Sequence, residues 1–324
     1  MMQRIINRAK ELLQNGEVRC VLGLKRGEFF YDQTPAVFAT PEELNELVYD
    51  SFSSPNLSKY LIRETQAEGK VLALLKPCDT YSLNQLVAEH RIDRSKVYVL
   101  GLPCAGKLDI NLIRDQGVKG LLSVQEEEDT VQIETLYGSM SLPRQNVLAE
   151  RCRCCKALQP VAADEIIEPE ESGQEEREDR FARVSAIEQM TEEERYAFWR
   201  GELSRCIRCN ACRNACPACS CVECVFDHAD SGVQAKVNTN EFEENLFHII
   251  RALHVAGRCT DCGECARVCP QRIPLQLLNR KLIWDIDRLY GPYQAGAEGA
   301  QQNPLTAFDP QDPEPGQWVR RNET

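Results

Sequence analysis

The chain has 324 residues, enough for two domains, and its formal net charge of −12 argues against nucleic acid as a partner. Seventeen cysteines occur without a secretory signal, because the amphipathic segment 1–14 lacks the continuous apolar core of a leader. No apolar run reaches the length of a membrane span. We therefore expect a cytoplasmic protein with reduced cysteines, without direct membrane insertion, rather than a disulfide framework.

Residues 1–163 carry alternating strand and helix signals. Apolar runs at 18–24, 70–75 and 97–102 are typical of strands in a parallel sheet, the last two being covered on both faces. Capping signals favour helices at 40–50, 54–69, 79–87 and 109–116, with Asp79 as the cap of the third. The pattern predicts an α/β domain with a mostly parallel sheet, to which 130–136 adds an antiparallel edge. No G-x-G-x-x-G follows a strand, so a dinucleotide-binding fingerprint is absent.

Cysteines follow two of these strands. Cys78 comes after the strand 70–75, and Cys104 comes after the strand 97–102. Because parallel strands end at one edge of a sheet, both thiols should lie in one crevice. With Cys152 and Cys155 they offer four thiolates for a 4Fe–4S cluster. The alternative is that all four are inert buried cysteines.

Acidic residues dominate 164–185, which we predict to be a solvated linker that separates two domains. Beyond it, Thr191 and Glu194 form a capping box for a helix. A helix capped by Asn240 and ended by Gly257 is expected next, and another begins at Pro274. The last segment, 292–324, is expected to be extended or disordered.

Two cysteine runs of identical spacing, each ending in Cys-Pro, organise residues 186–291. In a bacterial-type ferredoxin, the first three thiolates of each run hold one cluster and the fourth holds the other. The spacing therefore predicts two 4Fe–4S clusters. The first would be held by Cys206, Cys209, Cys212 and Cys269, and the second by Cys259, Cys262, Cys265 and Cys216.

Other interpretations of these cysteines fit less well. Zinc sites join two C-x2-C pairs and do not repeat a run of four thiols. The C-x3-C-x2-C triplet of radical S-adenosylmethionine enzymes also occurs, at Cys212, Cys216 and Cys219, but the ferredoxin pattern already explains two of these cysteines. Cys219, Cys221 and Cys224 exceed what two clusters need, and packing is the favoured role over an alternate ligand or another metal. Cys154 has no assigned role.

The sequence also resembles known families. Helices around widely separated runs are similar to the α-helical ferredoxins of heterodisulfide reductases and respiratory dehydrogenases. The stretches "LKPCD", "VLGLPC" and "CRCC…P" within residues 15–165 resemble the beta subunits of coenzyme F420 hydrogenases and dehydrogenases. In those subunits the module order differs, since any ferredoxin module precedes the α/β domain. Residues after 186 are similar instead to the ferredoxin portions of sulfhydrogenase electron-transfer subunits.

The expected function is electron transfer. Nothing in the sequence indicates an acid–base or nucleophilic site, so we expect an iron–sulfur subunit that relays electrons between protein partners through three 4Fe–4S clusters. The resemblance implies a hydrogenase, formate dehydrogenase or heterodisulfide-reductase-like flavoprotein as partner. The alternative is a flavoenzyme that holds FAD in the α/β domain and exchanges hydride with a deazaflavin or nicotinamide.

Overall fold

The computed structural model describes residues 1–169, 177–228, 241–297 and 303–306. Its larger sheet has the strand order β2-β1-β3-β4-β8. The strands are β1 (Cys20–Arg26), β2 (Gln33–Phe38), β3 (Val71–Leu75), β4 (Val97–Gly101) and β8 (Glu165–Ile166). β1, β3, β4 and β8 run parallel, and β2 pairs antiparallel with β1. The prediction of an α/β fold with a mostly parallel sheet is therefore confirmed.

Helices cover both faces of this sheet, because successive side chains of a strand point to opposite sides. Leu72 of β3 packs with α1 (Met2–Gln14) on one face. Ala73 packs with α2 (Leu61–Glu64) and α3 (Pro77–Ala88) on the other face. All five side chains of β3 are buried, as its continuous apolar run predicts.

Several helix predictions in this part need correction. α3 begins at Pro77 with Lys76 as its cap, so Asp79 is the third helical residue and accepts a hydrogen bond from the Lys76 backbone. Only the 3-10 turns η1 (Glu43–Glu46) and η2 (Ser58–Tyr60) and the short α2 form within 40–69, and η3 (Arg94–Lys96) precedes β4. After η1 the chain pairs with β1 instead, where the Val48 backbone donates to Leu24.

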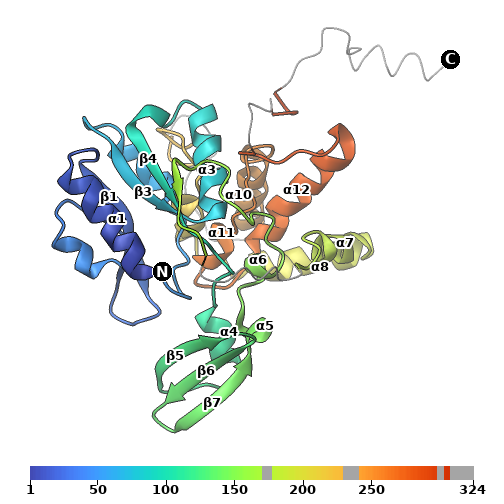
Figure 1. Cartoon of the computed structure of the whole chain (residues 1–324). Helices are drawn as coiled ribbons and strands as arrows, with labels where there is room; N and C mark the ends of the chain where they lie inside the picture. The colour runs from blue at the N-terminus through green and yellow to red at the C-terminus, as the bar shows by residue number, and fades with distance from the viewer. Residues whose placement is uncertain (170–176, 229–240, 298–302, 307–324) are drawn as a thin grey trace.

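The predicted antiparallel edge is also wrong. Residues 130–135 form β6 (Thr130–Thr135) in a separate sheet with β5 (Leu121–Glu127) and β7 (Gly138–Pro143). Tight turns join these three strands, so they pair with one another, and the sheet projects away from the rest of the molecule (Figure 1). Its apolar face packs on α4 (Ile110–Asp115) and α5 (Arg144–Val147).

Among the described residues after 181, every regular element is a helix. These helices are α7 (Ala182–Glu188), α8 (Glu192–Leu203), α9 (Ala211–Ala215), α10 (Glu241–His254), α11 (Glu264–Arg267) and α12 (Leu275–Tyr290). The predicted capping box opens α8, with Thr191 and Glu194 hydrogen-bonded to each other's backbone. The proposed cap Asn240 and most of the tail 292–324 lie outside the described residues.

The segment 164–185, predicted to be a linker, forms regular secondary structure at both of its described ends. Glu165–Ile166 is strand β8, and Ala182 onward is α7. The two parts of the chain also share an interface (Figure 1), where Arg258 of the helical part pairs with Glu89 at the end of α3. The linker therefore does not hold two separate bodies apart.

Candidate iron–sulfur centres

The two ferredoxin-type runs adopt the same backbone shape. Arg208 and Asn210 in the first run have positive φ angles of 52° and 61°. Asp261 and Gly263, at the equivalent places in the second run, have φ angles of 60° and 68°. Left-handed residues tighten each loop, which turns the thiols of one run toward a common side. The shared spacing thus produces a shared local structure.

The first run shares a cavity with a cysteine of the second. Cys206, Cys209, Cys212 and Cys269 line it together. The cavity is also lined by His248 of α10, which is 2% exposed. Burial raises the pKa of the Cys206 thiol to about 12, so a thiolate there needs a positive partner such as iron.

The second run lies next to the remaining cysteine of the first, since Cys259 packs against Cys216. Burial raises the pKa values of Cys259, Cys262 and Cys265, and the neighbouring Cys216 thiol raises each of them further. The pKa of Cys265 rises to about 12. Four neighbouring thiols, of which Cys216 and Cys265 are buried, are the donor set of an iron–sulfur cluster, with charge on the metal offsetting the desolvation of the thiolates.

The cavity of the third cysteine group, called the third cavity from here on, lies at the carboxyl ends of β3 and β4. Cys78, Cys104, Cys152 and Cys155 line it, the last two from α6 (Glu150–Arg153) and the turn after it. Gly106 lets the chain approach closely, since a Cβ there would lie 2.8 Å from Leu148 and 3.4 Å from Cys152. The structure thus gathers the four cysteines that the sequence analysis grouped.

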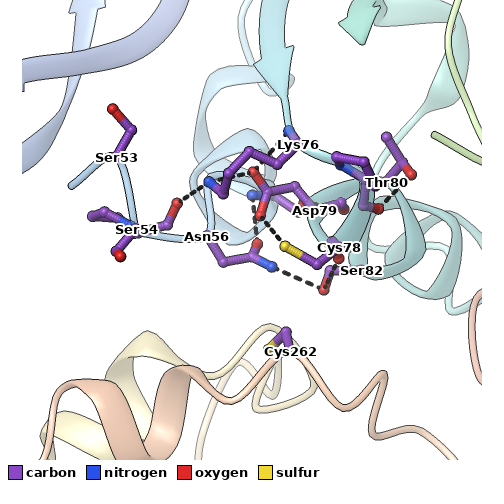
Figure 2. A network of polar contacts seen from close by, with 12 residues as sticks. Ser53, Ser54, Asn56, Lys76, Cys78, Asp79, Thr80, Ser82 and Cys262 are labelled. Atoms are coloured by element: carbon purple, nitrogen blue, oxygen red, sulfur yellow. Dashed lines mark hydrogen bonds and ion pairs between the residues drawn. The ribbon is translucent and has the colours of Figure 1, made fainter. Parts of the chain in front are cut away.

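Buried cations surround this third cavity. Lys76 is 3% exposed, and its Nζ donates to the Pro55 carbonyl at 2.7 Å and to Asp79 at 2.9 Å (Figure 2). Burial opposes the charge on Lys76, but the Asp79 carboxylate raises its pKa overall. Lys107 lies over the Tyr49 ring, 4.1 Å from its centroid. Burial and the Asp79 carboxylate nevertheless raise the pKa of the Cys78 thiol well above its usual range, and Lys76 offsets this only in part, so a thiolate there needs a positive partner such as iron.

The third cavity meets the second run directly. Cys262 also lines it, across from Cys78 in Figure 2. Arg151 of α6 ties the two sides together, because it donates to the carbonyl of Cys262 at 3.0 Å and to that of Ser54 at 2.8 Å. Arg151 also pairs with the buried Glu264 of α11 at 2.6 Å. The three cysteine groups therefore follow one another in space.

Sequence reasoning missed the residues between these groups. Arg251 of α10 is 3% exposed, donates to the Cys212 carbonyl at 3.4 Å and lies near thiols of both runs. Glu244 and His248 come within 4.8 Å of the Cys206 sulfur, where such groups can bind metals. Their places depend on the packing of α10, for which cysteine spacing gives no signal.

Other cysteines lie outside the three groups. The Cys154 thiol contacts Arg280 at 3.2 Å and donates to the Glu150 carbonyl at 3.2 Å. The Cys219 thiol is hydrogen-bonded to Cys216, and Arg213 is hydrogen-bonded to Cys224. Within the described residues, no helix is long and apolar enough to span a membrane.

Comparisons with known proteins agree with this picture. Residues 202–273 match a family described as a 4Fe-4S dicluster domain. The beta subunit of the F420-dependent formate dehydrogenase of Methanocaldococcus jannaschii is 25% identical over 84% of this chain and 86% of its own length. The beta subunit of F420-dependent formate dehydrogenase 1 of Methanococcus maripaludis is 24% identical over 69% of this chain and 74% of its own.

Among solved structures, a chain of the F420-reducing [NiFe] hydrogenase complex from Methanosarcina barkeri aligns with 47% of this chain and 62% of its own, at 14% identity and a TM-score of 0.36. That likeness is too low to bear on function. The chain thus resembles the beta subunits of F420-dependent formate dehydrogenases over most of its length, carries a 4Fe-4S dicluster domain, and has the character of an iron–sulfur electron-transfer subunit of an oxidoreductase complex.

Proposed function

We propose that the chain relays electrons between partner subunits of a cytoplasmic oxidoreductase complex through three 4Fe–4S clusters. Partners would be of the hydrogenase, formate dehydrogenase or heterodisulfide reductase type, and the names of two relatives support the formate dehydrogenase type. The observation that carries the proposal is the position of Cys262. It belongs to the second run and also lines the cavity of Cys78 and Cys104.

The ligands would be those predicted from the spacing. Each group offers four thiols, and burial raises the pKa of at least one thiol in every group, as with Cys78, Cys206 and Cys262. Clusters bound there would supply one-electron transfer. The chain's own residues would set the path, because Arg151 holds α6 against the backbone of Cys262. The order from first run to second run to third cavity follows from these contacts.

Iron analysis of cysteine variants tests the third centre. The wild type, isolated anaerobically, should hold about 12 iron and 12 sulfide per chain. Cys78→Ser and Cys104→Ser should each lose about 4 iron, because each removes one of four ligands. Cys154→Ser is the matched control, since its thiol bonds Arg280 outside the cavity. Full iron content in Cys78→Ser and Cys104→Ser would remove the third cluster from the proposal.

A second candidate function is that of a flavoenzyme. A cleft of about 490 Å³ lies between the α/β part and the helical part, with Cys269 on its wall. Phe29, Tyr31 and Phe52 line it with several arginines, among them Arg114. Aromatic rings and arginines suit a flavin and its diphosphate. A flavin absorption band in the anaerobically isolated chain, near one flavin per chain, would favour this function, and its absence would favour the relay alone.

A further inference from the structure

A large basic pocket is lined by none of the twelve cysteines of the three groups. It has a volume of about 400 Å³, which suits a small-molecule ligand. Six lysine and arginine side chains line it: Lys59, Arg63, Arg91, Arg213, Arg251 and Arg258. Among the described residues a single acidic side chain, that of Asp227, lines it. For a chain with a net charge of −12, this is a marked concentration of positive charge.

Some of these cations already have carboxylate partners. Arg213 pairs with Asp227 at 2.9 Å, Arg258 with Glu89, and Arg63 with Glu64 at 2.9 Å. Those three arginines need no further anion.

The remaining cations lack a carboxylate partner among the described residues. Lys59 donates to the backbone carbonyl of Arg213 at 3.2 Å, and burial lowers its pKa. The Nε atoms of Arg91 and Arg251 are buried without a hydrogen-bond partner. Lys59 and Arg91 are half-buried, and Arg251 is buried. Removing cations from water without a carboxylate beside them is costly, so an anion is the ligand that would stabilise this arrangement.

Part of the remaining lining is apolar and aromatic. The apolar side chains include those of Ile62, Ala218, Val255 and Phe226, and polar residues such as Asn214 and Ser220 lie beside them. An apolar wall next to several cations suits a ligand with a flat ring at one end and phosphate at the other. A metal ion fits less well. Three cysteines line the pocket, Cys219, Cys221 and Cys224, but among the described residues they form no group whose sulfur atoms all lie within 4.8 Å of one another.

We propose that the basic pocket binds a phosphate-bearing nucleotide, and that this binding is coupled to the redox state of the neighbouring cysteine centres. Arg251 provides the coupling, because it lines the pocket and also donates to the Cys212 carbonyl. Its charge also lies near the thiols of Cys216 and Cys265. Only the coupling rests on the function proposed above. The binding itself does not.

The sign of the coupling follows from charge. Each electron added to a cluster beside Arg251 adds negative charge close to the pocket, and this repels a bound anion. The nucleotide should therefore bind more weakly to the reduced protein. Because coupling between two sites is reciprocal, bound nucleotide should lower the reduction potential of the clusters.

Calorimetric titration of the anaerobically purified full chain tests the binding, with ADP and inorganic pyrophosphate as probes. The double variant Lys59→Gln/Arg91→Gln should weaken ADP binding about tenfold or more, since it removes two charges with no carboxylate partner. Arg94→Gln is the matched control, because its side chain lies outside the pocket and pairs with Asp164 at 2.9 Å, and it should change affinity by less than about twofold. Iron content and circular dichroism should match the wild type in both variants.

Three results would overturn the inference. One is no binding of either probe by the oxidised wild type at about 1 mM. Another is unchanged affinity in the double variant. The third is a bound metal ion, additional to the iron of the clusters, that is lost in the variant Cys221→Ser. The pocket would then be a metal site. Equal ADP affinity in oxidised and dithionite-reduced protein would overturn the coupling alone. Loss of the third cluster in Cys78→Ser should leave the affinity for ADP unchanged. The iron content of that variant therefore tests the electron relay and not the nucleotide site.

Discussion

Replacing Glu264 with glutamine should destabilise the contact between the second cysteine run and the third cavity. The Glu264 carboxylate is 2% exposed and lies between Arg151, at 2.6 Å, and Arg267, at 2.8 Å. Burial would raise its pKa, but the two arginines lower it from 4.5 to about 2. A shift of that size corresponds to about 3 kcal/mol of native-state stability. Breaking a buried ion pair has a similar effect.

Anaerobic thermal unfolding of Glu264→Gln would measure this loss. We expect a fall in Tm of about 5 °C or more for about 3 kcal/mol. Arg272→Gln is the control, because it breaks an ion pair with Asp115 across the same interface. The Arg272 and Asp115 side chains are 49% and 45% exposed. That exposed pair should contribute less than about 1 kcal/mol. If the two variants unfold at the same temperature, the buried pair does not hold the two parts together as argued.

Three further predictions follow from the same contacts. Cys216→Ser should alter the electron paramagnetic resonance signal of the cluster held by the 259–265 run, and a change confined to the 206–212 run would contradict the crossed ligation. In a redox titration, Arg251→Gln should lower the reduction potentials of both ferredoxin-type centres, because a positive charge near their thiols is lost. The reduction potential of the third centre serves as the internal reference. The ionised Glu264 carboxylate should stabilise the native state above pH 4.5, and this stability should be lost as the pH falls toward 2. The free energies of unfolding of wild type and Glu264→Gln should therefore differ at pH 7 and converge in acid. A difference that does not change with pH would refute the lowered pKa of Glu264.

The sequence by itself determined the local features. The spacing of each cysteine run sets a tight loop whose left-handed residues recur at Arg208 and Asp261, because only a few backbone shapes fit two residues between thiols. The continuous apolar run 70–75 likewise predicted a strand buried on both faces, and the capping box at Thr191 predicted the start of α8. These features depend on residues close together in the chain.

Partners distant in the chain were predicted less reliably. The alternation at 130–136 predicted a strand, but a period of two does not say which strand it pairs with, and β6 joined its sequence neighbours. The acidic composition of 164–185 did not predict β8, because its pairing depends on the free edge of β4.

The tertiary structure alone decided how the cysteine groups connect. Cys262 lines the cavity of Cys78 because α6 and the second run pack together through Arg151 and Glu264. No spacing within either segment encodes that contact, since the two segments are separated by more than a hundred positions in the sequence. The unpaired cations of the basic pocket come together in the same way, from residues that share no motif but meet where α10 packs against the α/β part. Short-range spacing therefore specified the kind of ligands, and long-range packing specified which of them lie next to one another.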